Sequence, residues 1–220
     1  MQRIRVLLAD DHAILLEALL RLLQPEFEIV GAVSDGRSLV DEVARLSPDV
    51  VVLDIGMPLL NGIEASRQIR ATNPGTKIIF LTQQSGRDYA QKAFQLGASG
   101  YVVKNSAATE LVNALREVCA GRYYVASQMR AGLRAGPVLT ENPSGMFGTG
   151  LTPRQREVLQ LVAQGKSAKE IAYLLSISVK SVEFHKGSIM DNLGLRTTAE
   201  LTRYALRQGI MSAESAVLQA

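Results

Sequence analysis

Five polar residues stand at or near the ends of short apolar runs, and their types suit phosphoryl chemistry. Asp10 and Asp11 follow the first run, and Asp54 lies near the end of the third. Thr82 ends the fourth run and Lys104 ends the fifth. Three carboxylates in one small site repel one another unless a cation is present, and oxygen ligands alone suit Mg²⁺. Because Mg²⁺ commonly shares its shell with phosphate and a carboxylate can be the nucleophile, these residues predict an aspartyl-phosphate site. Lys104 and the Thr82 hydroxyl would hold the phosphoryl oxygens.

The elements that must position these residues follow from an alternating pattern between residue 3 and about residue 120. The predicted strands are Arg3–Ala9, Glu28–Val33, Val50–Ile55, Lys77–Thr82 and Gly100–Lys104. The predicted helices are Ala13–Leu23, Arg37–Leu46, Gly62–Arg70, Arg87–Leu96 and Thr109–Ala120. Such alternation predicts a doubly wound α/β sheet of five parallel strands, whose carboxyl ends face one crevice. Each polar residue alone has an ordinary explanation, such as a solvated Asp after a strand, but together they favour one site.

The second half of the chain has a different pattern. Residues 121–150 hold 6 of the 18 glycines together with Pro137 and Pro143, which indicates a linker whose first part, Val125–Arg134, is a candidate helix. From residue 151 a helical period resumes, with Thr152 before Pro153 as a helix start.

Four short helices are predicted after residue 151, and capping residues and glycines mark where they begin and end. Capping boxes are expected at Ser167–Glu170 and Thr197–Glu200, and helix ends at Gly165, Gly194 and Gly209. A short turn at Ser176–Ser178 separates the second helix from a longer third one. Helix, tight turn and longer helix is the layout of a DNA-binding helix-turn-helix.

Composition narrows the class of protein. The 220 residues are 47% hydrophobic and 20% charged, which excludes a disordered chain. Cys119 is the only cysteine, so a disulfide framework and a multi-cysteine metal site are excluded. No apolar run approaches the ~20 residues of a membrane helix, and the start does not resemble a signal peptide. We therefore expect a cytoplasmic two-domain protein without a membrane partner. The net charge of +3 is concentrated in residues 151–210, which hold nine basic and five acidic residues.

The first half resembles the response-regulator receiver domain over residues 3–120. The matching motifs are "VLLADDH", "VVLDIGMP", "IIFLT" and "GYVVK". The resemblance implies a flavodoxin-like fold in which Asp54 accepts a phosphoryl group from a sensor histidine kinase. It also implies that Asp10, Asp11, Asp54 and the backbone carbonyl of Gly56 bind Mg²⁺. Thr82 and Tyr101 would form the switch pair.

One position departs from the receiver pattern. The residue after the switch threonine is usually small, and here it is Gln83. Its amide would either slow the entry of a phosphoryl donor or of hydrolytic water, or point away from the site.

The second half resembles the LuxR-type helix-turn-helix of the NarL/FixJ subfamily over about residues 148–210. The recognition helix is expected at Val179–Leu193, with Val182, Ile189 and Leu193 as its buried stripe. Arg154 and Glu157 are expected to form a helix-surface pair. The candidate DNA-binding residues are Lys166, Lys169, Lys180, Ser181, Glu183, His185, Lys186 and Ser188.

These observations predict four segments and one function. The segments are a receiver domain at 1–121, a partly helical linker at 122–147, a four-helix DNA-binding domain at 148–212 and a tail at 213–220. The function is that of a phosphorylation-controlled transcription regulator that binds promoter DNA and forms a homodimer when active. It is not expected to be an enzyme, beyond assisting its own phosphoryl transfer and dephosphorylation. Two alternatives are a regulator whose receiver acts without phosphorylation, as a dimerisation or ligand module, and an aspartate-nucleophile phosphohydrolase, which would need a second Asp where Gly56 stands.

Overall fold

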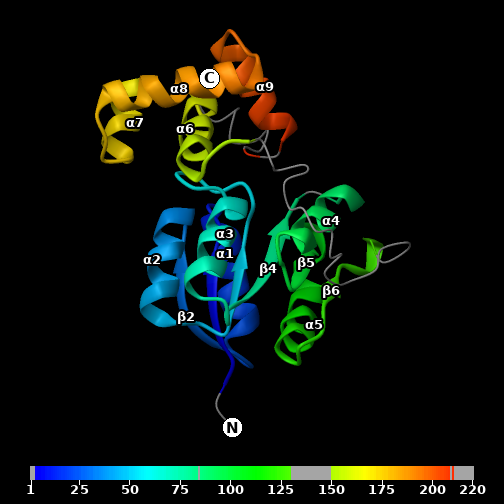
Figure 1. The fold of residues 1–220 in the computed structure, drawn as a ribbon. Helices are drawn as coiled ribbons and strands as arrows, with labels where there is room; N and C mark the ends of the chain where they lie inside the picture. The colour runs from blue at the N-terminus through cyan, green and yellow to red at the C-terminus, as the bar shows by residue number, and fades with distance from the viewer. Residues whose placement is uncertain (1–2, 84, 130–149, 209, 211–220) are drawn as a thin grey trace.

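A six-stranded parallel sheet forms the first domain in this computed structural model, which describes residues 3–83, 85–129, 150–208 and 210. The strands lie in the order β2-β1-β3-β4-β5-β6 (Figure 1). Their bounds are β1 Arg5–Ala9, β2 Glu28–Val33, β3 Val50–Leu53, β4 Lys77–Thr82, β5 Gly100–Val103 and β6 Tyr124–Val125. The doubly wound sheet and its five predicted strands are confirmed.

The sixth strand was not predicted. Tyr124 and Val125 pair with Gly100 and Tyr101 of β5, and a 3₁₀ turn at Ser127–Met129 follows. The first residues of the candidate helix Val125–Arg134 are therefore strand and 3₁₀ turn, and residues 130–134 lie outside the described part of the chain. A strand of two residues is too short to leave a periodic signal.

Helices cover both faces of the sheet. They are α1 Ala13–Leu23, α2 Gly36–Leu46, α3 Gly62–Thr72, α4 Arg87–Gln95 and α5 Ala107–Cys119, with a 3₁₀ turn at Lys104–Ser106. Alternate residues of the central strands enter two separate cores. Leu7, Val51 and Phe80 pack in one core with residues of α2, α3 and α4, whereas Leu8 and Val52 pack in the other with residues of α1 and α5. Burial on both faces explains why these strands are continuously apolar.

Four short helices form the second domain, as the sequence predicts. They are α6 Pro153–Ala163, α7 Ala168–Leu174, α8 Val179–Leu193 and α9 Thr198–Arg207. Thr152, Ser167 and Thr197 each complete a capping box. Gly165 and Gly194 follow α6 and α8 in the left-handed region, with φ of 76° and 65°, and Gly209 lies outside the described residues. Helices this short depend on their common core, which is built around Val158, Val182, Ile189 and Leu201.

The two domains meet through α6. In Figure 1, α6 (yellow-green) stands between the receiver sheet and α8, so the recognition helix lies on the side away from the receiver. None of the described helices is long and apolar enough to cross a membrane.

Candidate functional site

The predicted acidic site exists as one cluster at the carboxyl ends of β1, β3 and β5. The Lys104 ammonium lies 2.8 Å from Asp10 Oδ2 and 3.1 Å from Asp54 Oδ2. Carboxylate oxygens of Asp10, Asp11 and Asp54 and a ring nitrogen of His12 all lie within 4.8 Å of one another. Asp10 and Asp54 are buried, whereas Asp11 and His12 are exposed. The site is therefore closed to solvent on the side of Asp10 and Asp54 and open to solvent on the side of Asp11 and His12.

Backbone pairing fixes where these side chains start. The Asp10 N–H donates to the Val33 carbonyl, and the Asp54 N–H donates to the Ala9 carbonyl. Each aspartate is thus the first residue beyond its strand and is still held by the neighbouring strand. The Asp54 carboxylate also accepts a hydrogen bond of 2.8 Å from the Ile55 N–H.

Electrostatics couple Asp54 to Lys104. Burial raises the pKa of Asp54, the charge of Lys104 lowers it, and the charge of Asp10 raises it again, with a net increase. Burial alone would lower the pKa of Lys104, but Asp54 and Asp10 outweigh it and raise the pKa. The ammonium therefore stays charged and compensates for part of the negative charge around Asp54.

The expected switch residues lie beside this cluster. Thr82 ends β4 and Tyr101 lies on β5, and both are buried. Burial raises the pKa of Tyr101, which shares a side-chain hydrogen bond with Thr82. Gly56 lies two residues after Asp54 and is half-buried, and the side chain of Gln83 is exposed.

His12 is a site residue that the sequence reasoning missed. Its Nδ1 lies 2.9 Å from Oδ1 of Asp10 and of Asp11, and 3.4 Å from the Lys104 ammonium. Its backbone N–H donates to Asp10 Oδ1. A histidine directly after two acidic residues at a strand end was the available signal.

The charge balance and donor set suit a divalent cation. Three carboxylates face one ammonium, which leaves an excess of negative charge. Oxygen donors in a cluster of this size match the preference of Mg²⁺. Asp10, Asp11 and Asp54 could therefore hold Mg²⁺, and the histidine adds one nitrogen donor.

The second domain presents the predicted recognition helix with its expected inner face. Val182 and Ile189 are buried, and Leu193 packs against them from the edge of the core. Among the candidate DNA-binding residues, the exposed side chains are Lys169, Lys180 and Glu183, and the partly exposed ones are Lys166, Ser181, His185, Lys186 and Ser188.

Both candidate serines form hydrogen bonds within the domain. The Ser188 hydroxyl accepts a hydrogen bond of 2.9 Å from Gln155 on α6. The Ser181 hydroxyl lies 2.8 Å from the hydroxyl of Ser178, the residue that caps α8. Phe184, which was not among the candidates, is 72% exposed.

The loop after the phosphoacceptor candidate contacts the second domain directly. We call residues 54–61 the β3–α3 loop. The Gln160 side chain on α6 accepts a hydrogen bond of 2.8 Å from the Asn61 N–H and donates one of 2.9 Å to the Met57 carbonyl. Asn61 also caps α3 and donates through Nδ2 to the Ile210 carbonyl. One buried amide thus joins two points of this loop to α6.

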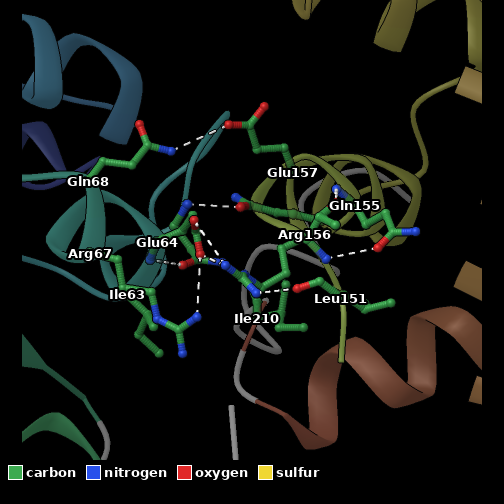
Figure 2. Close-up of polar contacts among 12 residues, drawn as sticks. Ile63, Glu64, Arg67, Gln68, Leu151, Gln155, Arg156, Glu157 and Ile210 are labelled. Atoms are coloured by element: carbon green, nitrogen blue, oxygen red, sulfur yellow. Dashed lines mark hydrogen bonds and ion pairs between the residues drawn. The ribbon is translucent and has the colours of Figure 1, made fainter. Parts of the chain in front are cut away.

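Ion pairs lie next to this contact, and Figure 2 shows the one between Arg156 and Glu64. Arg156 Nε lies 2.7 Å from Glu64 Oε2, and Glu64 is buried. Glu157 accepts from Arg154 at 2.6 Å and from Arg37 at 3.2 Å. The predicted pair of Arg154 and Glu157 is therefore present, but at 8% exposure Glu157 lies in the domain interface and not on a free helix surface.

Comparisons with known proteins agree with both domains. The family model described as "Response regulator receiver domain" matches residues 6–116, and that described as "Bacterial regulatory proteins, luxR family" matches residues 149–205. The transcriptional regulatory protein MctR of Rhizobium johnstonii is 35% identical over 212 residues, which cover 96% of each chain. The oxygen regulatory protein NreC of Staphylococcus aureus is 35% identical over 214 residues, 94% of this chain and 99% of that protein.

The chain belongs to the NarL/FixJ-type response regulators.

Solved structures of response regulators show the same two-domain design. RcsB of Salmonella typhimurium is 28% identical, with a TM-score of 0.60, and the match covers 96% of this response regulator and 100% of that chain. A complex of RcsB with DNA is 27% identical, with a TM-score of 0.56, and the match covers 98% and 100% of the two chains. The acidic cluster thus lies in a receiver domain, and α8 lies in a LuxR-type DNA-binding domain.

Proposed function

We propose that this response regulator binds promoter DNA under the control of phosphorylation, and that a sensor histidine kinase phosphorylates Asp54. One observation carries the proposal. The buried Asp54 carboxylate lies 3.1 Å from the Lys104 ammonium, and the β3–α3 loop that begins at Asp54 contacts the DNA-binding domain. The described part of the chain offers the nucleophile, its charge partner and a physical link to the output domain.

The phosphoryl transfer uses groups that the structure brings together. An oxygen of Asp54 attacks the phosphorus of phosphohistidine, the new P–O bond forms and the P–N bond breaks, and the histidine leaves. Lys104 is positioned to compensate for the added charge of about −1.5 to −2. Mg²⁺ held by Asp10, Asp11, Asp54 and the Gly56 carbonyl would neutralise phosphoryl oxygens. Thr82 would then move toward the phosphate, and Tyr101, its hydrogen-bond partner, would repack.

The DNA-binding half of the proposal rests on family and charge. Among the relatives, RcsB has been solved in complex with DNA and as two dimers on two parallel DNAs. One small helix-turn-helix buries only about 600–1,000 Å² on DNA, so two copies on adjacent half-sites bind far better than one. We propose that the phosphorylated protein is a homodimer that uses the α7–α8 candidates, and that it acts in the cytoplasm, where promoter DNA lies. We retain 1–121, 122–147, 148–212 and 213–220 as the proposed segments, and we expect no enzymatic turnover of an external substrate.

Replacement of Asp54 tests the phosphorylation step. Asp54→Ala should abolish ³²P labelling by a histidine kinase or a small acyl phosphate, because alanine has no nucleophile. Asp41→Ala, at an exposed position on α2, is the matched control and should label like the wild type. Retained labelling of the Asp54→Ala protein would overturn the assignment.

A further inference from the structure

Phe184 is an exposed apolar side chain on the outer face of the recognition helix. It follows the buried Val182 by two residues, which places it about 200° around the helix axis from the core. Its side chain is 72% exposed in the described domain. Packing within the domain does not explain a phenylalanine on the outer face of α8, whose other exposed residues include Val179, Lys180 and Glu183.

The residues around Phe184 form an open strip along α8. Lys180 precedes it by one turn, and Gly187 follows it by three residues on the same face. A Cβ added at Gly187 would meet nothing within 4 Å, so no contact inside the protein requires glycine there. A glycine inside a helix costs about 1 kcal/mol relative to alanine. A partner that approaches this face of the backbone closely would explain that cost.

The Phe184 ring also contacts a neighbouring ring on the same helix. Phe184 and His185 lie edge to face, with ring centroids 5.8 Å apart and an interplanar angle of 65°. Side chains on a helix lean toward its N-terminus, which in a helix-turn-helix is the end that reaches the base edges. The Phe184 ring therefore leans toward Lys180 and the entering end of α8.

From these contacts we infer that Phe184 contacts the methyl group of thymine in the major groove and so determines part of the sequence preference. The thymine methyl is the apolar group on that groove surface, and phenylalanine is one of the side chains that contact it. The inference rests on the proposed DNA binding and adds the base that one residue selects. Charge supports DNA over a second protein copy as the occupant, because Lys180 lies one turn before the ring on the same face and residues 151–210 carry a net charge of +4.

The experiment removes the methyl group from the DNA and the ring from the protein in separate steps. Duplexes selected from a random pool by the full-length phosphorylated chain are resynthesised with each thymine replaced in turn by deoxyuridine, which lacks only the methyl group. For at least one thymine in each half-site, the change should weaken wild-type binding about four-fold, the equivalent of about 0.8 kcal/mol for one buried methyl group. The Phe184→Ala protein should bind the thymine and uracil duplexes equally.

Three controls distinguish a thymine contact by Phe184 from a general effect of the substitution on DNA binding or on folding. Tyr173→Ala removes an even more exposed aromatic ring (86%) from α7 and should keep the thymine-to-uracil difference. Phe184→Ala should leave the salt dependence of binding unchanged, because an apolar contact releases no counterion, whereas Lys186→Ala should lower the slope by about one. The melting temperature of the Phe184→Ala protein should equal that of the wild type, since the ring is exposed.

The outcomes distinguish this inference from the proposed function. If the wild type binds selected duplexes but no thymine-to-uracil change matters, or if Phe184→Ala keeps the difference, the assignment of Phe184 is wrong and DNA binding stands. If Phe184→Ala converts dimers to monomers in sedimentation without DNA, the ring contacts a second copy and the inference also fails. If no duplex is bound at all, the proposed function fails with it.

Discussion

Cys119 lies half-buried near the end of α5, and its surroundings keep the thiol protonated. Burial raises the pKa of Cys119 to about 11, and the charge of Asp49 adds to this effect against an opposing contribution from Lys77. The thiolate is the reactive form, so below this pH only a small fraction of the side chain can be alkylated. Nothing in this setting marks Cys119 as a reactive or regulatory thiol.

This shift predicts a pH profile for alkylation, which is easily measured because the chain has one cysteine. The rate for the native protein should rise about tenfold per pH unit and level off only near pH 11. The urea-unfolded chain is the control and should level off near ~8.5, the ordinary value for a free thiol. A native profile that is flat above pH 9 would contradict the predicted burial of this thiol.

The start of α3 packs directly against the end of β3. A Cβ at Gly62 would lie 2.0 Å from the Asp54 carbonyl oxygen, and the Gly62 N–H donates to the Ile55 carbonyl. Because both oxygens belong to the backbone, neither can move aside without shifting Asp54 or Ile55. Glycine at this position is therefore a steric requirement of the site.

Gly62→Ala should destabilise the receiver by about 3 kcal/mol, the upper part of the range for overpacking, and should slow the labelling of Asp54. Helix propensity alone predicts the opposite sign, a gain of up to about 1 kcal/mol. Gly75→Ala is the matched control, since a Cβ there meets nothing within 4 Å, and should change the free energy of unfolding by less than about 0.5 kcal/mol. Urea unfolding measures both, and a neutral Gly62→Ala protein would refute the steric argument.

The elements themselves were largely predictable because their signals are local. The bounds of β4, α1 and α8 match the prediction, and the capping boxes at Ser167 and Thr197 lie within four residues of sequence. The acidic site was predictable because parallel strands bring their ends to one edge. The contact of Gln160 with Asn61 was not, since 99 residues separate them and neither type signals the other. Glu157 was assigned to a free surface for the same reason.

Between the domains, the pair of Arg156 and Glu64 is shorter and more buried than the pair of Arg37 and Glu157. Reversing the charge in Arg156→Glu places two carboxylates together at a buried position, and breaking such a pair costs about 3–5 kcal/mol. The domains should separate, and the radius of gyration from small-angle scattering should increase. Arg203→Glu makes the same charge change at an exposed position of α9 and should leave the radius unchanged. The double change Glu64→Arg with Arg156→Glu should restore the compact form, and a compact Arg156→Glu protein would contradict the interface.

The docked domains leave α8 on the side away from the receiver (Figure 1). The recognition helix is thus accessible while α6 still holds the β3–α3 loop, so exposure of α8 does not require the domains to part. If the contact between α6 and the β3–α3 loop controls DNA binding, it does so without uncovering α8. It would change how two copies are placed on their half-sites, or it would change the conformation of the loop.

The bridge made by Gln160 has a thermodynamic consequence. Its amide bonds both the Asn61 N–H and the Met57 carbonyl, so the docking of α6 and the conformation of the β3–α3 loop belong to one equilibrium. Linkage is reciprocal: whatever factor a ligand of this loop imposes on docking, docking imposes on the affinity for that ligand. The isolated receiver and the full-length chain should therefore differ in Mg²⁺ affinity at the proposed site, although α6 contributes no residue to that site.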